Sequence, residues 1–377
     1  MGEDHPAIQP SPGGRQSPQD GAASSACREA AALDEAGQHI QAIALLSRAA
    51  AGGDLLAKRT VGLRILLGDR APLLGPQGVT LLRETASDGD ALSADLVSIL
   101  SGAGIHCTQD WGEALHWLQY AAELGSPRAR GALRVLCTDP DLAARAAAAE
   151  PERALWGALR ADIDLGAWLT PPPGRDVHGD PLVRAFAGFA SPRLCAWLMA
   201  QACGRLSRAE VYNPHTGSVE QTGERTNSAA LFSLLDTDLA QIMMQMRIAA
   251  AVGTPFAHLE PAAVLHYSAG QAFEDHYDFV DPQIPEYAQD IARNGQRVVT
   301  FLLYLNDDYS GGTTEFPRLA LRHKGRAGDA MFFVNVRPGG VGDTRTLHAG
   351  RPPQSGEKWV LTQFVRDRVV VPGLQPG

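Results

Sequence analysis

The sequence lacks any hydrophobic run long enough to cross a membrane. No apolar stretch in its 377 residues approaches the roughly 18 to 20 residues that a membrane-spanning helix needs. The N-terminal stretch, MGEDHPAIQPSPGGRQSPQDGAASS, also lacks the basic start and apolar core of a secretion signal. We therefore expect no membrane association and a cytoplasmic location.

Cysteine is scarce, and the number and spacing of the cysteines argue against a disulfide framework. The chain has 5 cysteines, an odd number, and no CxxC pair. This pattern argues against a disulfide framework and predicts free thiols in a reducing compartment. The cysteines are Cys27, Cys107, Cys137, Cys195 and Cys203.

The chain also lacks an excess of positive charge. It carries 33 Lys and Arg residues against 42 Asp and Glu residues, which gives a formal net charge of −9. This balance argues against a broad electrostatic grip on nucleic acid or on an anionic membrane. With 45% hydrophobic and 20% charged residues, the composition is that of a soluble globular protein, and the length suffices for two domains.

The N-terminal third of the chain contains an internal repeat. Residues 1–25 are rich in Pro, Gly, Ser and Gln and are predicted to be a disordered tail. From residue 26 to residue 160 the apolar residues follow helical spacing, and Gly53, Gly89 and Gly125 recur at a step of 36 residues (89 − 53 = 36 and 125 − 89 = 36). Each unit is predicted to be a helix, a Gly-containing turn and a second helix that must stack on a neighbour.

The third of these units, from Asp110 to Gly125, resembles a Sel1-like repeat, a relative of the tetratricopeptide repeat. The resemblance implies an N-terminal helical solenoid. Two interpretations stay open for it. The helices either support the rest of the protein or offer a concave surface on which a protein partner or substrate docks.

The pattern changes after residue 160. Residues 161–175 contain the run Thr170-Pro171-Pro172-Pro173-Gly174 and are predicted to be a linker. Helices are predicted over 191–204 and 236–252. Short β-type runs separated by Gly, Pro and Asp follow, which indicates an antiparallel sandwich or barrel. The predicted strands are 263–267, 297–305, 319–323, 330–335, 344–348 and 359–364.

The stretch from Leu265 to Phe279 contains a pattern suited to metal binding. His276 and Asp278 are two residues apart, so in an extended segment their side chains point to the same side. His348 is the best candidate for a third ligand. Two histidines and one carboxylate, with the remaining positions open, form the ligand set of non-haem Fe(II) oxygenases.

Several motifs in order strengthen this interpretation. They are Arg225-Thr226-Asn227, Tyr267-x-x-Gly270-x-x-Phe273-x-x-His276-x-Asp278, the run 296–306 (QRVVTFLLYLN), the run 311–317 (GGTTEFP), Gly328-Asp329-Ala330, 347–350 (LHAG) and Lys358-Trp359. Together they resemble the prolyl 4-hydroxylase branch of the Fe(II)/2-oxoglutarate dioxygenases over residues 176–371. For the whole chain, the resemblance implies an α+β protein of two domains. The second domain would be a double-stranded β-helix, or jelly roll, with flanking helices.

The resemblance also implies roles for single residues. His276, Asp278 and His348 would bind Fe(II) and form the catalytic triad, and Lys358 would bind the distal carboxylate of 2-oxoglutarate. Tyr267 and Tyr304 match positions whose hydroxyl groups contact this cosubstrate. Ascorbate would serve as a reductant.

Substrate contacts are implied at three further positions. Arg297 matches a residue that contacts the peptide in prolyl hydroxylases. Phe273 stands where relatives commonly carry Tyr, and Phe364 where they commonly carry Trp. Both departures keep an aromatic surface but lose a hydrogen-bonding group.

The function expected from these residues is hydroxylation of a prolyl residue in a protein or peptide, with the helical repeats used for docking. An alternative keeps the cofactors but changes the substrate to another residue or a small molecule. A third interpretation, of a different class, is a repeat adaptor whose barrel is catalytically silent.

Overall fold

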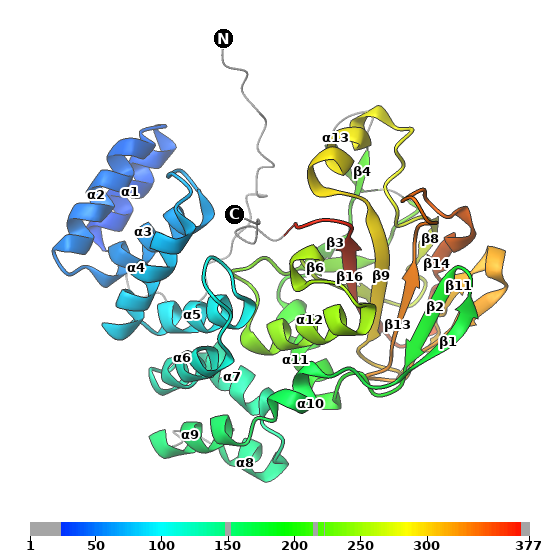
Figure 1. The fold of residues 1–377 in the computed structure, drawn as a ribbon, viewed down its shortest axis with the longest axis horizontal. Helices are drawn as coiled ribbons and strands as arrows, with labels where there is room; N and C mark the ends of the chain where they lie inside the picture. Colours follow the sequence, from blue (N-terminus) through cyan, green and yellow to red (C-terminus); the bar gives the residue numbers. More distant parts are fainter. Residues whose placement is uncertain (1–23, 148–151, 214–217, 222, 371–377) are drawn as a thin grey trace. The chain divides into compact units, whose positions relative to one another are not determined.

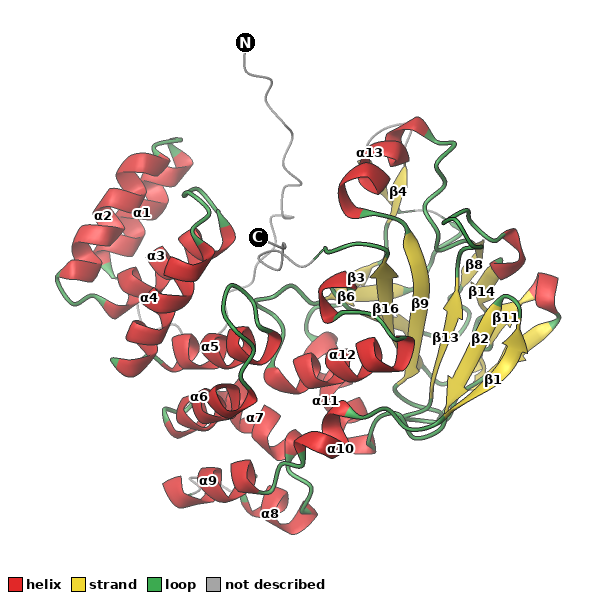
Figure 2. Cartoon of the chain, in the orientation of Figure 1, coloured by secondary structure: helices red, strands yellow, loops and turns green. Residues whose placement is uncertain are grey.

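The computed structural model describes residues 24–147, 152–213, 218–221 and 223–370. The tail predicted over residues 1–25 lies almost entirely outside these ranges. The chain forms two compact units, one ending at Thr85 and the other beginning at Ala86, and each is considered by itself. Figure 1 shows helices in the blue and cyan part of the chain, and the strands, yellow in Figure 2, begin at Gly174.

Ten helices of the described chain precede the first strand. They are α1 (Ser25–Glu35), α2 (His39–Ala51), α3 (Leu55–Leu67), α4 (Gly75–Ser87), α5 (Ala91–Ala103), α6 (Trp111–Glu123), α7 (Pro127–Leu136), α8 (Pro140–Arg145), α9 (Arg153–Ala161) and α10 (Leu165–Leu169). The helices α2, α4 and α6 begin 36 residues apart (75 − 39 = 36 and 111 − 75 = 36), so the predicted repeat is confirmed.

The turns between the helices of each repeat share one conformation. Gly53, Gly89 and Gly125 have φ values of +92°, +98° and +98°, a region that favours glycine. The residue that follows each of them caps the next helix, because Asp54 and Asp90 accept a hydrogen bond from the backbone N–H three residues on. The sequence step of 36 residues therefore reflects the same turn and cap built three times.

The interval 161–175, predicted as a linker, contains α10. Trp168 of this helix is buried and donates a hydrogen bond from Nε1 to the Leu136 carbonyl at 2.8 Å. The division between the two compact units falls at residues 85 and 86, upstream of this interval, so the third repeat belongs to the same unit as the strands. The boundary at 160 remains a prediction.

The unit that begins at Ala86 contains an eight-stranded antiparallel sheet. Its strand order is β1-β2-β13-β9-β16-β7-β6-β3. The strands are β1 (Gly174–Gly179), β2 (Leu182–Phe186), β3 (Ser207–Arg208), β6 (Ser228–Leu231), β7 (Ala263–Tyr267), β9 (Arg297–Tyr304), β13 (Ala330–Val334) and β16 (Lys358–Arg366).

A smaller antiparallel sheet has the order β12-β11-β14-β8. Its strands are β8 (Phe273–His276), β11 (Thr314–Phe316), β12 (Leu321–His323) and β14 (His348–Gly350). Two short pairs accompany it, β4 (Val211–Asn213) with β5 (Ser218–Glu220) and β10 (Ser310–Gly311) with β15 (Pro353–Ser355).

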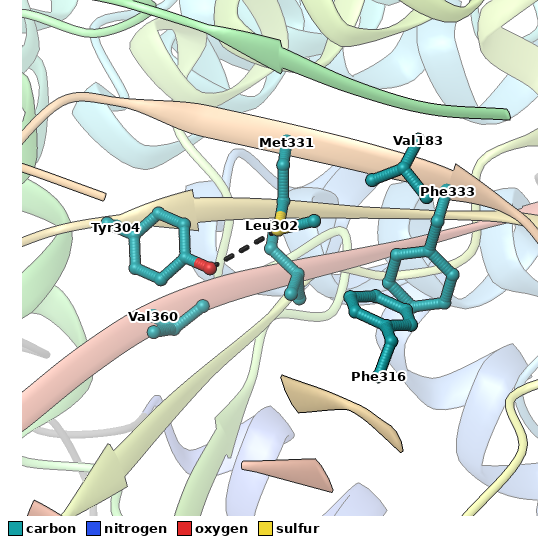
Figure 3. Packing of buried hydrophobic residues seen from close by; sticks show 7 residues of the cluster. All are labelled: Val183, Leu302, Tyr304, Phe316, Met331, Phe333 and Val360. Atoms are coloured by element: carbon teal, nitrogen blue, oxygen red, sulfur yellow. Dashed lines mark hydrogen bonds between the residues drawn. The ribbon is translucent and has the colours of Figure 1, made fainter. Parts of the chain in front are cut away.

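The two sheets pack face to face as a jelly roll around an apolar core. Phe316 of β11 meets Phe333 of β13 edge to face, with ring centroids 4.9 Å apart. Leu302, Tyr304 and Met331 of the large sheet complete this contact (Figure 3). The expected fold class, helical repeats followed by a jelly roll with flanking helices, is confirmed.

Helices cover the other face of the large sheet, as Figure 1 shows for α11 (Pro192–Cys203) and α12 (Leu239–Val252). Gln245 of α12 donates to Gln363 of β16 at 3.0 Å, with both side chains buried. A last helix, α13 (Pro285–Asn294), lies between β8 and β9 in the sequence.

Two predicted strands are wrong in their first part. The strand predicted over 319–323 begins only at Leu321, because Leu319 ends a 3-10 helix, and the strand predicted over 344–348 also begins late. Residues 344–346 form a short 3-10 helix, η3 (Thr344–Thr346), and β14 begins only at His348. Asp343 causes this turn, because its side chain accepts the Arg345 backbone N–H at 3.0 Å and its carbonyl accepts the Thr346 N–H at 3.0 Å. Two further 3-10 helices are η1 (Phe256–His258) and η2 (Pro317–Leu319).

Candidate metal centre

Three side chains predicted as ligands meet between the sheets. His276 ends β8 and His348 begins β14, and these two residues are direct partners in the antiparallel register. Asp278 lies just beyond the end of β8. One ligand atom from each residue lies within 4.8 Å of the others, and this is the single such group of His, Cys, Asp and Glu among the described residues. The Nε2 atom of His348 is 3.2 Å from Asp278 Oδ2, and that of His276 is 3.5 Å from Asp278 Oδ1.

Each imidazole is held in one orientation. The Nδ1 atom of His276 lies 2.7 Å from the Glu274 carbonyl, and that of His348 lies 3.0 Å from the Thr346 carbonyl. Because a carbonyl only accepts, Nδ1 donates in both cases, which directs Nε2 of each ring toward Asp278. The ring of Phe273 stacks on His276 with centroids 3.5 Å apart, which further limits its rotation.

The electrostatics keep the three groups ready for a cation. Burial, and then repulsion from His348, lower the pKa of His276, so its ring is neutral at physiological pH. Burial alone would raise the pKa of Asp278, but its interactions with the two histidines hold this pKa well below the ordinary value. A neutral imidazole at His276 and an ionised carboxylate at Asp278 are forms in which these groups can bind a metal.

The donor set fits Fe(II). Imidazole and carboxylate ligands suit ferrous iron, and three protein ligands leave open positions for further groups. A structural zinc site would more often be closed by four ligands and contain cysteine. No cysteine belongs to this group.

Lys358, at the start of β16, is buried next to Tyr267 and Tyr304. Its side chain is only 2% exposed, and it has no carboxylate partner among the residues that the structure describes. Burial, and to a smaller extent the charge of Lys324, lower the pKa of its ammonium group to about 7. A buried ammonium without a counter-ion suits a ligand that brings its own carboxylate.

The two predicted tyrosines line the same region. The Nζ atom of Lys358 lies 5.2 Å from the ring centroid of Tyr267 and 6.0 Å from that of Tyr304. The Tyr304 hydroxyl lies 2.9 Å from the Thr314 hydroxyl, a residue for which the sequence analysis assigned no role. Burial raises the pKa of Tyr267 to about 12, so its hydroxyl stays protonated.

Arg297 and Phe364 also lie together. The guanidinium of Arg297 stacks on the Phe364 ring, 3.9 Å from its centroid, and binds Glu260 through two hydrogen bonds of 2.7 and 2.8 Å. Arg366 binds the same Glu260 carboxylate. The structure thus shows Arg297 engaged by its neighbours, and its contact with a peptide remains a prediction.

Phe273 differs in position from that pair. Its ring contacts are with His276 and with the guanidinium of Arg225, which lies 4.6 Å from the ring centroid. Phe273 therefore stabilises a metal ligand, and its expected role in substrate binding is untested.

Thr300 and Asn335, for which the sequence predicted no role, are both buried close to Asp278. The Thr300 hydroxyl donates to Asp278 Oδ2 at 2.7 Å, and Asn335 Nδ2 lies 2.9 Å from that hydroxyl oxygen. Thr300, Leu302 and Tyr304 alternate along β9. The period of two residues, counted back from Tyr304, could therefore have placed Thr300 on the inner face.

Comparison with known proteins agrees with this geometry. Residues 262–366 match the family model of the 2OG-Fe(II) oxygenase superfamily. The chain is 32% identical over 200 residues to probable prolyl 4-hydroxylase 9 of Arabidopsis thaliana, covering 48% of this chain and 68% of the relative. The chain is also similar to the alpha-1 subunits of animal prolyl 4-hydroxylases, but it spans much less of their length, 38% for the protein of Gallus gallus.

Two solved structures are similar to separate parts of the chain. The viral collagen prolyl hydroxylase of Paramecium bursaria Chlorella virus-1 has 24% identity and a TM-score of 0.37, covering 49% of this chain and 95% of its own. A Sel1 repeat protein from Oxalobacter formigenes has 21% identity and a TM-score of 0.30, covering 38% of this chain and 60% of its own.

Proposed function

The chain belongs to the 2OG-Fe(II) oxygenase superfamily, and from this premise we propose that it hydroxylates a prolyl residue of a protein or peptide substrate. Its cofactor is Fe(II) and its cosubstrate is 2-oxoglutarate. The proposal of proline as the target is supported by the 32% identity to a plant prolyl 4-hydroxylase.

One observation carries the catalytic part of the proposal. The ligand atoms of His276, Asp278 and His348 converge within 4.8 Å, and Lys358 is buried with no carboxylate partner among the described residues. A catalytically silent barrel has no physical need for all four groups, since burying an ammonium and a carboxylate is unfavourable unless a ligand compensates them.

The residues of the chain would divide the work. His276, Asp278 and His348 hold the iron, while Lys358, with the hydroxyl groups of Tyr267 and Tyr304, orients 2-oxoglutarate by its distal carboxylate. When bound, iron and 2-oxoglutarate together activate dioxygen, with 2-oxoglutarate converted to succinate and carbon dioxide. The apolar core around the site excludes water from this chemistry.

Substrate would be recognised by side chains at the edge of the site. Arg297 offers a planar guanidinium and Phe364 an aromatic surface, the kind of pair that can hold a peptide with few hydrogen-bond donors. Phe273 would contribute from the side of His276.

We further propose that the helical repeats dock the substrate or a partner protein. The support is a groove that borders α6, where Trp117 and Tyr120 pack edge to face with centroids 5.9 Å apart. Aromatic side chains are frequent at protein interfaces. The groove is lined by Ser87, His116, Trp117, Gln119, Tyr120, Glu123 and Arg153.

A cytoplasmic location is proposed from the cysteines, all five of which are free thiols. No helix in the described ranges has both the length and the hydropathy required to cross a bilayer. In a reducing compartment ferrous iron is maintained, and ascorbate is proposed as an additional reductant.

The test is a turnover assay with peptides. Purified protein loaded with Fe(II) is given 2-oxoglutarate and proline-containing peptides, and succinate and peptide mass are measured. We expect succinate to rise with peptide and the peptide to gain one oxygen atom on proline. Oxygen gained at another residue would favour the alternative substrate class. Iron and cosubstrate binding without succinate would favour the silent adaptor.

A further inference from the structure

Asp278 and His348 are 70 residues apart in the sequence (348 − 278 = 70), and Asp278 lies beyond the end of its strand. The ladder between β8 and β14 pairs the two histidines but leaves this carboxylate outside it. Something else must therefore hold Asp278 in position against His348.

The first contact is made by Thr300 of β9. This residue is 1% exposed, and its hydroxyl lies 2.7 Å from Asp278 Oδ2, the same oxygen that faces His348 Nε2. The ionised carboxylate only accepts hydrogen bonds, so the threonine hydroxyl must be the donor. Its one hydrogen is thereby committed to Asp278.

The second contact is a hydrogen bond between Thr300 and Asn335, in which Thr300 is the acceptor. The Thr300 oxygen lies 2.9 Å from Nδ2 of Asn335, which is fully buried just after β13. Because the threonine hydrogen is already used, Asn335 must donate from Nδ2. Its own Oδ1 is left buried with no partner within the described part of the chain, and such an unpaired acceptor is unfavourable in a protein interior. The orientation of the amide is thus set by Thr300.

The backbone of Asn335 is connected to His348, the other metal ligand, through a series of hydrogen bonds. Its carbonyl accepts the Asp343 N–H at 2.8 Å. The Asp343 carbonyl accepts both the N–H and the hydroxyl of Thr346, at 3.0 and 2.8 Å. The Thr346 carbonyl in turn accepts Nδ1 of His348 at 3.0 Å.

These contacts form one continuous path between two metal ligands, and each of its residues is buried. We propose that Asn335 is a positioning residue that couples the orientation of Asp278 to that of His348, through Thr300 on one side and the turn at Asp343 on the other. The inference rests on the proposed metal site. Contacts that orient metal ligands in this way typically contribute 10- to 100-fold to metal affinity, roughly.

The first experiment measures Mn(II) binding to the metal-free full-length protein by electron paramagnetic resonance, without substrate. Thr300→Val keeps the shape of the side chain but removes the hydroxyl, and we expect its Kd for Mn(II) to rise by roughly 10- to 100-fold. Thr300→Ser keeps the hydroxyl and is expected to stay within about threefold of the wild type. Equal Mn(II) affinity for the valine variant and the wild type would overturn the proposal.

A double-mutant cycle tests whether Asn335 acts through Thr300. Asn335→Ala removes the Nδ2 donor but keeps the backbone contact with Asp343, so we expect weaker Mn(II) binding. If the relay exists, Thr300→Val combined with Asn335→Ala binds Mn(II) about as well as Thr300→Val alone, because the second change has nothing left to act on. Additive losses of affinity would contradict the relay.

Thermal unfolding of each metal-free variant shows whether it folds. If Asn335→Ala does not fold, the comparison of valine with serine at position 300 still tests the contact of Thr300 with Asp278, and equal affinities there would overturn the proposal. Wild-type protein that binds Mn(II) but hydroxylates no peptide would contradict the proposed function while leaving this inference intact. Wild-type protein that binds no Mn(II) would overturn both.

Discussion

Lys358 and Tyr267 face each other across β16 and β7 as a direct antiparallel pair, with the lysine ammonium 5.2 Å from the centroid of the tyrosine ring. The ring can stabilise the buried cation by a cation–π interaction, worth about 1–2 kcal/mol when water is excluded. It cannot replace a carboxylate. The pair therefore leaves the ammonium without a counter-charge from the described residues, which agrees with a cosubstrate that carries two carboxylates.

Binding of 2-oxoglutarate is expected to take up a proton. Burial lowers the pKa of Lys358 to about 7, so near pH 8 most protein molecules without cosubstrate carry a neutral amine. The carboxylate of 2-oxoglutarate favours the ammonium form and raises this pKa. Calorimetric titration of the metal-loaded protein, without oxygen and in buffers of different ionisation enthalpy, should show uptake of close to one proton.

Lys358→Arg is the control for this measurement, because a guanidinium stays charged at all relevant pH values. The affinity of the wild type for 2-oxoglutarate should fall as pH rises above about 7, whereas the variant should show no such trend. If the enthalpy of binding to the wild type does not depend on the buffer, Lys358 is not a neutral amine before 2-oxoglutarate binds.

Removal of the buried cation should stabilise the protein when no cosubstrate is bound. The pKa of Lys358 is lower in the folded protein, about 7, than the ordinary value of 10.5, so the unfolded chain binds more protons between these pH values. The stability of the wild type must then rise with pH across this window. At pH 6, Lys358→Met is expected to unfold with a free energy larger by up to about 3–5 kcal/mol.

Urea denaturation at several pH values measures this gain. It should shrink as pH increases from 7 towards 10, because the neutral amine no longer opposes folding. A methionine variant that is less stable than the wild type at pH 6 would show that the ammonium has a partner in the folded state.

Arg297 is expected to contribute to both stability and substrate binding. Its two hydrogen bonds to Glu260 are largely buried, and Arg297→Ala should lower the free energy of unfolding by roughly 3 kcal/mol. Arg297→Lys keeps the charge but loses the planar pair of donors and should lower it less. In the lysine variant we expect a raised KM for peptide with little change in kcat. An unchanged KM would mean that Arg297 serves only to hold Glu260.

The groove beside α6 offers a test of docking. Tyr120→Ala removes part of the aromatic wall of this groove. If the repeats recruit substrate, the variant should show a raised KM for a protein substrate and an unchanged KM for a short peptide that reaches only the metal site. Equal KM values for both substrates in variant and wild type would favour a purely supporting role for the helices.

Much of this architecture could be predicted from local patterns. Gly53, Gly89 and Gly125 all adopt a positive φ in the turn between two helices. Because this turn recurs every 36 residues, the period in the sequence predicted where the helices begin. The metal ligands were predictable for a similar reason. Two histidines and an aspartate in this spacing are an unusual combination, and His276 and His348 lie within motifs that occur in the order expected for the family.

What the sequence could not predict depends on contacts between distant segments. Thr300 lies in an apolar strand and Asn335 directly follows another, and only the pairing of β9 with β13 brings them together next to Asp278. The same limit applies to Arg297. The family resemblance implied a substrate contact for it, but its partner Glu260 lies 37 residues away and became apparent only with the fold.

The most direct test of the proposed function is the mass of a proline-containing peptide after incubation with the Fe(II)-loaded protein, 2-oxoglutarate and oxygen. Wild-type protein should add one oxygen atom to the peptide and form one succinate for each addition. Asp278→Ala, which lacks the carboxylate ligand, should do neither. Hydroxylation that persists in Asp278→Ala, or succinate formation that never leads to a hydroxylated proline, would contradict the account.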